Sequence, residues 1–440
     1  MKRSLIILCA TLCGMSLSAQ QGFDHTAPEI AARMGIAWNL GNTLEAGGSS
    51  NNFTNKGGLG AETSWQKTKT SQEVIDFVKS QGFNAIRIPC AWIMGHINDA
   101  TTYEIDAEWM ARVKEVVDYC VKDDLYVMLN QHWDGGWLEN NIKDDSKKEK
   151  NKLILEAVWT QIAEAFKDYD EHVLFAGLNE PNAENQKETD NLIEYEQVFV
   201  NAVRATGGNN MYRTLIVQGP STNIEHTYNY YKSLPVDPAG EGKLMMEVHY
   251  YNPWQFWGME KDESWGKVFY YWGKENHQPG SSHNPNWDCE ESAMEKQLDM
   301  MVTKFVSKGV PVVIGEFGAN WRDISKLSGE SQDKHDASIR LHYYLLTKFC
   351  LERGLVPTMW DTNYCNRPSM TIIDRENLKI YNSLMMDAIN QAREECLSIE
   401  QPSADVSSRQ GRAYDLMGHP VNPAQKLQGL YIVNGKKVCY

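Results

Sequence analysis

Several enzyme signatures are absent from this sequence of 440 residues. The metal-ligand spacings His-x-His and His-Glu-x-x-His do not occur, which disfavours the usual zinc hydrolases. Neither Gly-x-Ser-x-Gly nor a phosphate loop ending in Gly-Lys-Ser/Thr occurs, which argues against serine hydrolases and nucleotide-dependent enzymes. We therefore expect a chemistry that needs neither a catalytic metal nor a cofactor.

Positive charge and long apolar runs are also scarce. Lys and Arg number 43 against 58 Asp and Glu, which gives a net charge of −15 without a basic stripe. This balance argues against nucleic acid or an anionic membrane surface as a partner. Beyond the amino terminus no stretch of about 18 uninterrupted apolar residues occurs, so no membrane span is predicted. We expect a monomer that binds a neutral or cationic partner.

The amino terminus has the three zones of a secretory signal. Met1-Lys2-Arg3 is basic, residues 5–10 are apolar, and small residues lead up to Ala19. We predict a signal peptide over residues 1–19 and a protein that is secreted or held at the cell surface. Lipoprotein anchoring through Cys13 is less favoured, because Leu12 stands where a lipobox has a small residue. The seven later cysteines are widely and irregularly spaced, so they indicate no disulfide framework.

Short apolar runs alternate with longer amphipathic stretches along residues 24–396. Eight runs are strand candidates, at 36–39, 85–88, 126–130, 173–178, 214–218, 244–248, 311–314 and 356–360. Helical periodicity marks 71–80, 107–121, 153–169, 195–205, 293–306, 337–351 and 378–392. This alternation predicts an α/β fold, a (β/α)8 TIM barrel, whose active site lies at the carboxyl ends of the strands.

Two glutamates stand at corresponding places in this pattern. Glu180 follows the run 173–178, and Glu316 follows the run 311–314. A single glutamate after a strand means little, since most such residues cap helices or anchor loops. A pair suits glycoside hydrolysis, in which one carboxyl group protonates the leaving oxygen while the other attacks the anomeric carbon or activates water.

Other strand candidates also end in polar or aromatic side chains. In a barrel these endings converge on one mouth, although each alone is more often structural. The candidates are Arg87, His132, Asn179, His249, Tyr251 and Trp360.

The residues around these positions resemble glycoside hydrolase family 5, in particular its subfamily 4 of endo-β-glucanases. The resemblance covers nearly the whole barrel. It rests on the following segments, in the family's order: 38–45 (Trp-Asn-Leu-Gly-Asn-Thr-Leu-Glu), 62–65, 83–89, 129–137, 178–181 (Leu-Asn-Glu-Pro), 249–254, 314–318 (Ile-Gly-Glu-Phe-Gly) and 357–361.

The resemblance implies a retaining endo-β-1,4-glucanase that hydrolyses internal bonds of cellulose, mixed-linkage glucan, xyloglucan or glucomannan. Glu316 is then the nucleophile and Glu180 the acid/base. We expect Arg87 to keep Glu316 ionised, and the charge of Glu316 to raise the pKa of Glu180. The remaining implied roles are binding of the 2-hydroxyl by Asn179, a hydrogen bond from Tyr251 to Glu316, a hydrophobic floor from Trp360, and support from Asn39, His132 and His249.

Two further features bear on substrate binding. Trp133 follows His132 where the family often has a second histidine, so subsite preference is expected to differ from such members. Trp137 and Trp254 fall in loops after strand endings, where flat indoles could stack on sugar rings as readily as pack in a core.

The carboxyl terminus differs in composition from the barrel. Residues 397–411 read as a polar linker, and residues 412–440 as a short β-rich tail in which Asn434-Gly435 signals a β-hairpin. The tail resembles the sorting segment of proteins exported by the type nine secretion system of the Bacteroidetes, with His419 where an arginine is usual. The alternative is a small β-appendage that packs on the barrel.

Other functions stay open from sequence alone. A mannanase or a xylanase would use the same scaffold. A non-catalytic glycan-binding barrel is the rival of a different class, and it would be expected to lack one of Glu180, Glu316 and Arg87, all of which are present.

Overall fold

The computed structural model describes residues 23–47 and 58–400, together with four short strands near the carboxyl terminus. The predicted signal peptide, residues 401–411 of the predicted linker, and Asn434-Gly435 lie outside the described residues. None of the helices in the described part has the length and apolar character that a membrane span requires.

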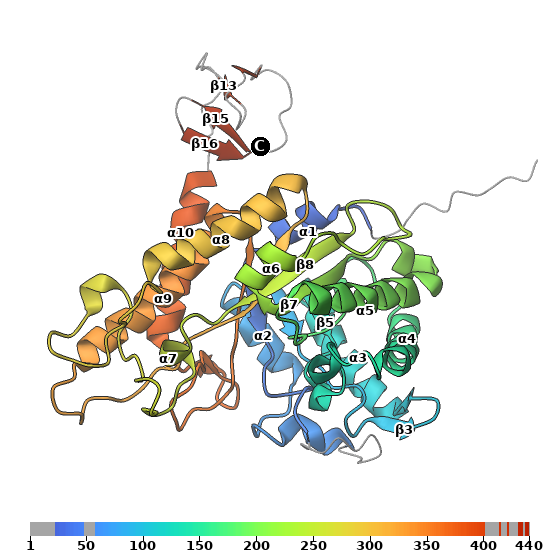
Figure 1. Ribbon diagram of the computed structural model, residues 1–440, viewed down its shortest axis with the longest axis horizontal. Helices are drawn as coiled ribbons and strands as arrows, with labels where there is room; N and C mark the ends of the chain where they lie inside the picture. Colours follow the sequence, from blue (N-terminus) through green and yellow to red (C-terminus); the bar gives the residue numbers. More distant parts are fainter. Residues whose placement is uncertain are drawn as a thin grey trace, which may run out of the picture.

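Eight parallel strands close into a barrel, as predicted (Figure 1). Around the barrel the order is β1-β10-β9-β8-β7-β6-β5-β2, so chain neighbours pair and the last strand returns to the first. The strands are β1 (Ala37–Asn39), β2 (Ala85–Ile88), β5 (Tyr126–Asn130), β6 (Val173–Ala176), β7 (Leu215–Asn223), β8 (Leu244–Tyr250), β9 (Val312–Phe317) and β10 (Val356–Met359).

Helices follow the strands and cover the outside of the barrel, and Figure 1 shows α3, α4 and α5 side by side along one flank. The helices are α1 (Ala27–Met34), α2 (Gln72–Ser80), α3 (Ala107–Lys122), α4 (Lys148–Ala165), α5 (Gln186–Ala205), α6 (Ile224–Tyr230), α7 (Trp254–Trp257), α8 (Glu291–Lys304), α9 (Gln332–Glu352) and α10 (Ser383–Glu400). Short 3-10 turns are Gly58–Thr63, Asp134–Gly136, Glu139–Asn141, Gly208–Met211, Lys274–Asn276 and Val306–Lys308.

Some helix boundaries differ from the prediction for local reasons. Helix α5 begins at residue 186 rather than 195, because the side chain of Asn185 accepts a hydrogen bond from the backbone N–H of Glu188 and caps a polar first turn. Helix α10 begins at residue 383 rather than 378, because the preceding residues form β12 (Lys379–Ile380), which pairs with β11 (Ile373–Asp374).

Helix α1 was not predicted, and it closes the amino-terminal end of the barrel. Pro28 lies in its first turn, and a capping box joins Thr26 to Glu29. Its buried residues, including Ile30 and Met34, belong to the same apolar cluster as the lower interior of the barrel. The opposite end is left for the active site.

Inward side chains of the barrel form two layers, because alternate residues of a strand face the same side. The lower layer is apolar and contains Ala37, Ala85, Met128, Leu174, Ile216, Met245, Val313 and Val356. Two residues further along six of these strands, the upper layer is polar and contains Asn39, Arg87, Asn130, Gln218, Glu247 and Thr358, all of them buried; the exceptions are Ala176 on β6 and Gly315 on β9. The residues between them, such as Trp38 and Ile86, pack outward in the larger core with the helices.

Strand β9 carries a β-bulge at Gly315. Val248 of β8 pairs with Ile314, and the next residue, His249, pairs with Glu316, so Gly315 is the extra residue. A bulge re-aims the side chains that follow it. Glu316 is therefore turned toward the barrel mouth from within a strand, which extends to residue 317 rather than ending at 314 as predicted.

The carboxyl-terminal tail contains the expected hairpin within a slightly larger sheet. Strands β15 (Leu430–Val433) and β16 (Lys436–Cys439) pair antiparallel, with Val433 opposite Lys436. Two further strands, β13 (Ala413–Tyr414) and β14 (Pro420–Val421), extend the sheet to four strands. In Figure 1 this sheet stands beyond the end of α10.

A separate two-stranded sheet joins β3 (Ile97–Asp99) to β4 (Glu104–Ile105).

Candidate active site

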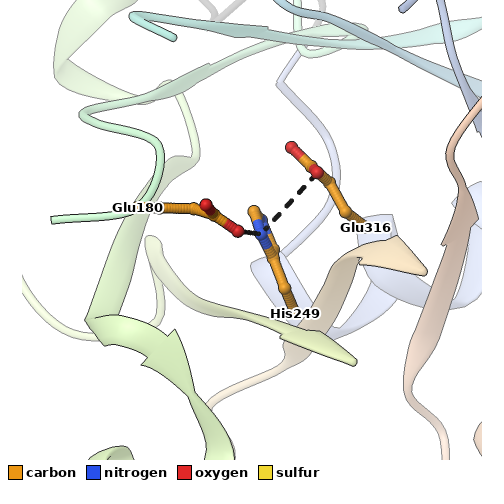
Figure 2. Close-up of side chains that lie close together, drawn as sticks. All are labelled: Glu180, His249 and Glu316. Atoms are coloured by element: carbon orange, nitrogen blue, oxygen red, sulfur yellow. Dashed lines mark hydrogen bonds and ion pairs between the residues drawn. The ribbon is translucent and has the colours of Figure 1, made fainter. Parts of the chain in front are cut away.

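The two predicted carboxylates meet at the carboxyl-terminal mouth of the barrel. Glu180 follows β6 and Glu316 lies on β9, with His249 of β8 between them (Figure 2). One oxygen of each carboxylate and one nitrogen of His249 all lie within 4.8 Å of one another. Residues from three separate strand ends thus form one compact group.

Glu316 is enclosed by hydrogen-bond donors. Its Oε1 accepts a bond from Nη1 of Arg87 at 2.9 Å, and its Oε2 accepts one from the Tyr251 hydroxyl at 3.1 Å. Only 7% of its side chain is exposed, against 44% for Glu180. One carboxylate is therefore fixed on the barrel wall, and the other faces open space.

Arg87 joins four neighbours inside the barrel. Besides Glu316, it donates from Nη1 to Oδ1 of Asn39 at 3.0 Å and from Nη2 to Oδ1 of Asn179 at 2.8 Å. Its Nε lies 2.8 Å from Oε1 of Glu247. Because this guanidinium is fully buried, its charge is stabilised by these partners instead of by water.

His249 stands between carboxylates on both sides of its ring. Nδ1 lies 2.8 Å from Oε1 of Glu180 and 3.9 Å from Oε2 of Glu316, and Nε2 lies 3.3 Å from Oε1 of Glu247. Burial disfavours the charged ring, but the three carboxylates outweigh burial and raise its pKa to about 10. This raised pKa favours a ring that is protonated on both nitrogens, each of which has a carboxylate oxygen as its neighbour.

Comparisons with known proteins agree with this geometry. The model of the family "Cellulase (glycosyl hydrolase family 5)" matches residues 48–366. The chain belongs to glycosyl hydrolase family 5.

Relatives cover most of this family 5 chain. Endoglucanase A of Paenibacillus barcinonensis is 34% identical over 408 residues, which are 88% of this chain and 96% of the relative. Among solved structures, the xyloglucan-specific β-1,4-glucanase XEG5B from a ruminal metagenomic library is 45% identical with a TM-score of 0.75, covering 84% of this chain and 96% of that one. A GH5-4 broad-specificity endoglucanase from Ruminococcus champanellensis is 30% identical with a TM-score of 0.71, covering 84% and 99%. The protein is a glycoside hydrolase of the endo-β-1,4-glucanase type.

His132, the second histidine of this family 5 site, has the opposite charge state. The Oδ1 of Asn130 accepts the backbone N–H of Cys90, so its amide nitrogen faces Nδ1 of His132, at 3.2 Å. Nδ1 is then an acceptor, and the proton sits on Nε2, which is 4.0 Å from Oε1 of Glu316. Burial, together with the nearby cations, lowers the pKa of His132 well below its usual value. The ring stacks on Trp360, with centroids 5.6 Å apart.

The protonation of the two glutamates differs from the sequence-based expectation. Burial raises the pKa of Glu316, against the attraction of His249 and Arg87. Burial also acts on Glu180, but the hydrogen bond and charge of His249 outweigh it and lower the pKa of Glu180. The hydrogen bond from His249 thus favours the carboxylate form of Glu180 in the unliganded protein.

The remaining predicted aromatic residues lie in different surroundings. Trp360 is partly exposed next to His132, and a Cβ on Gly41 would come within 3.0 Å of its indole. Trp254 is 46% exposed and packs edge-on against Trp257. Trp137 is only 6% exposed and donates its indole N–H to Asp134, so it belongs to the packed core beside the mouth.

Two buried acids of the site were missed by the sequence analysis. Glu247 lies two residues before His249 on the same strand, and the two-residue period could have placed it on the same face. Glu139 comes from the loop after β5, and its Oε1 accepts the backbone N–H of Glu180 at 2.7 Å. Burial raises the pKa of Glu139 to about 7. No sequence pattern points to Glu139, because its position depends on a loop.

A cavity of about 430 Å³ opens beside Glu180. Glu180 and His249 line it together with residues that end β7 and β8. Trp287 and residues from the first turns of α8 also line it.

Proposed function

We propose that this family 5 enzyme cleaves β-1,4-glucans by double displacement with retention of configuration. The observation that carries this proposal is the short distance between Glu180 and Glu316. One carboxylate oxygen of Glu180 lies within 4.8 Å of one carboxylate oxygen of Glu316. Retaining glycosidases hold their two carboxyl groups roughly 5 to 5.5 Å apart, whereas inverting enzymes leave roughly 6.5 to 9.5 Å for a water molecule.

In this proposal Glu316 is the nucleophile. It is held by Arg87 and Tyr251 at fixed oxygens, and it lies on a rigid strand inside the barrel. A nucleophile gains from such positioning, because attack needs the oxygen within van der Waals contact of the anomeric carbon. When the ester forms, the carboxylate charge disappears, and Arg87 keeps Asn39, Asn179 and Glu247 as partners.

Glu180 is the acid/base in this proposal. Its side chain is 44% exposed and lines the cavity in which we place the leaving group. A bound sugar would remove water from Glu180 and raise its pKa, so that it takes up a proton in the bound state. After the ester forms, Glu180 as carboxylate can activate the water that hydrolyses it.

Supporting residues surround the reacting bond. Arg87 orients the amide of Asn179, which we propose binds the 2-hydroxyl of the reacting sugar. His132 and Trp360 form one stacked apolar surface beside Glu316, suited to the face of a pyranose ring. Trp254 lies further out on the surface and is suited to a more distant sugar, whereas the burial of Trp137 favours a packing role.

Xyloglucan is our first candidate among the substrates, followed by unbranched and mixed-linkage β-glucans. The 45% identical structure is described as xyloglucan-specific, and the one from Ruminococcus champanellensis as a broad-specificity endoglucanase of GH5-4. These likenesses support membership of subfamily 4. A mannanase or xylanase remains the alternative on the same scaffold.

The first experiment is release of reducing sugar from xyloglucan, barley β-glucan, carboxymethylcellulose, glucomannan, mannan and xylan by the purified protein. We expect release from one or more β-1,4-glucans. Proton NMR of the first product tests the stereochemistry, and the β-anomer is expected before mutarotation. An initial α-anomer would overturn the retaining mechanism, and activity confined to mannan or xylan would favour the alternative.

We also propose that the enzyme is exported and is secreted or held at the cell surface. The support is the basic, apolar and small-residue order of residues 1–19. Mass spectrometry of the protein recovered from its native host tests this, with a mature amino terminus at Gln20 expected. An intact Met1 would overturn the proposal.

A further inference from the structure

Glu247 is a buried acid that the proposed steps do not use. It lies on β8 with 1% of its side chain exposed. Its Oε1 is 2.8 Å from Nε of Arg87 and 3.3 Å from Nε2 of His249, and its Oε2 accepts a hydrogen bond from Gln218 at 2.7 Å. Arg87 and His249 lower its pKa despite burial, so it is a carboxylate.

The fold holds this carboxylate firmly in place. A Cβ on Gly315 would lie 2.0 Å from Oε1 of Glu247, so only glycine leaves room for the acid at the bulge. Gln218 is itself fixed, because its Oε1 accepts the backbone N–H of Leu178 at 2.8 Å. Glu247 is therefore located by the strands that carry Glu180 and Glu316.

The charges that face His249 favour an imidazolium. Three carboxylates lie around the ring, namely Glu180, Glu316 and Glu247. One guanidinium, Arg87, shares two of them, while His132 is neutral and Tyr251 contributes a hydroxyl and an edge-on ring. With one fixed cation among three acids, a second positive charge on His249 brings the cluster closer to neutrality.

We propose that Glu247 is a positioning residue that holds both nitrogens of His249 protonated, so that His249 stores the proton that Glu180 delivers. The inference rests on the proposed function, because Glu180 must be the acid. It assigns the proton supply to the contact at 2.8 Å between Nδ1 of His249 and Oε1 of Glu180.

The proposed proton path is balanced over one turnover. On substrate binding the Nδ1–H bond of His249 breaks and an O–H bond forms on Glu180, which leaves both neutral. Glu180 then gives this proton to the glycosidic oxygen as the C1–O bond breaks and Glu316 bonds to C1. In the second step water forms a C1–O bond and gives a proton to Glu180, while the ester bond between C1 and Glu316 breaks and Glu316 leaves as a carboxylate. The proton on Glu180 then returns to Nδ1 of His249.

The charge state of His249 is tested directly on the wild-type protein. Histidine labelled with ¹⁵N reports whether each ring nitrogen is protonated, and loss of the signal in His249→Asn identifies the residue. We expect both nitrogens protonated at pH 8. A neutral ring at pH 7 would overturn the proposal, and this readout does not depend on hydrolysis.

The role of Glu247 is tested with Glu247→Gln, which keeps an acceptor but removes the charge. The alkaline limb of the pH profile of kcat/KM is expected to move down by at least about one pH unit, since His249 loses its proton more readily. The ¹⁵N titration of His249 should move by a similar amount. An unmoved titration and an unmoved limb would reduce Glu247 to a structural partner of Arg87 and overturn the proposal.

Glu196→Gln is the matched control. Glu196 is also fully buried, and it contacts the Tyr231 hydroxyl and the backbone of Gln218 but neither His249 nor Arg87. Its variant should keep the wild-type pH profile. If the wild-type enzyme hydrolyses none of the glucans, the proposed function fails while the titration of His249 still decides the state of the cluster. If Glu247→Gln does not fold, the ¹⁵N titration of His249 in the wild-type protein decides whether the ring holds both protons.

Discussion

The lower and upper halves of the barrel interior are built by the same strands but do different work. On β8 the inward residues are Met245, Glu247 and His249 in that order, and on β2 they are Ala85 and Arg87. A step of two residues along a strand, roughly 6.6 Å, thus changes an apolar core into a charged one. The comparison shows that stability and chemistry are separated by depth within one set of strands.

The two layers depend on each other. Buried charges are costly to desolvate, and those of the upper layer are stabilised chiefly by one another, through Arg87, His249 and three carboxylates. The lower layer, closed by α1, contributes apolar burial without polar groups that need partners. Substitutions in the upper layer should therefore change activity first, and those in the lower layer should change stability first.

The largest expected effect comes from removing the carboxylates at the top. Glu316→Ala should lower kcat on an aryl β-glucoside or a cello-oligosaccharide by at least about 10⁴-fold. Glu180→Ala should lower kcat less when the leaving group needs no acid. Added azide distinguishes the roles. It should give an α-glycosyl azide with Glu316→Ala and a β-glycosyl azide with Glu180→Ala.

The control for these variants is binding. Affinity electrophoresis in xyloglucan should show that both variants still bind the polymer. If Glu316→Ala kept wild-type turnover, the nucleophile would have to be another group. Identical azide products from both variants would contradict the separate roles.

The next effect tests the geometry of the upper layer rather than its charge. Arg87→Lys keeps one positive charge but cannot reach Glu316, Asn179 and Glu247 at once. We expect kcat/KM to fall by about a hundredfold to a thousandfold, as for the loss of a fixed donor at a reacting centre. Steady-state kinetics on cello-oligosaccharides measures this. Arg353→Lys, at a surface ion pair with Glu295, is the control. A fall below threefold would show that charge alone suffices.

Much of the barrel could be predicted from sequence, because its signals are local. All eight strands carry apolar runs, and the polar residues at their ends converge once the barrel closes. Arg87, His132, Asn179, His249, Tyr251 and Trp360 were found in this way, and they do lie together. Helix α1 was missed, since eight residues before the first strand give a weak pattern.

The charge states could not be predicted, because they depend on contacts between strands. A histidine looks the same in sequence whether an amide or two carboxylates surround its ring, yet His132 is neutral and His249 is charged. The bulge at Gly315 is likewise set by pairing with β8 and β10. The bond from His249 to Glu180, which lowers the pKa of Glu180, was not anticipated for the same reason.

A third effect tests the lower layer. Met245→Ala removes a fully buried side chain from the apolar cluster and leaves a cavity. The free energy of unfolding should fall by about 2 to 5 kcal/mol, while kcat per folded molecule and the pH profile stay unchanged. Urea unfolding followed by fluorescence measures the first quantity. Met300→Ala, at a partly buried position on α8, should cost less. A changed pH profile in Met245→Ala would contradict the separation of the two layers.

The smallest effect concerns Glu139, which holds the backbone of Glu180. In the folded protein its pKa is about 7, above its ordinary value, so the folded state keeps a proton that the unfolded state releases. Its contribution to stability is therefore full below about pH 4.5 and is lost as pH rises toward 7. Glu139→Gln still accepts the N–H of Glu180 but cannot ionise. Urea unfolding measures the free energy of unfolding of both proteins at pH 5 and at pH 8. The decrease in this free energy from pH 5 to pH 8 should be smaller in Glu139→Gln than in the wild type, by up to about 3 kcal/mol. Equal losses in both proteins would mean that Glu139 ionises normally in the fold, and that Glu180 is held by a carboxylate rather than by a neutral acid.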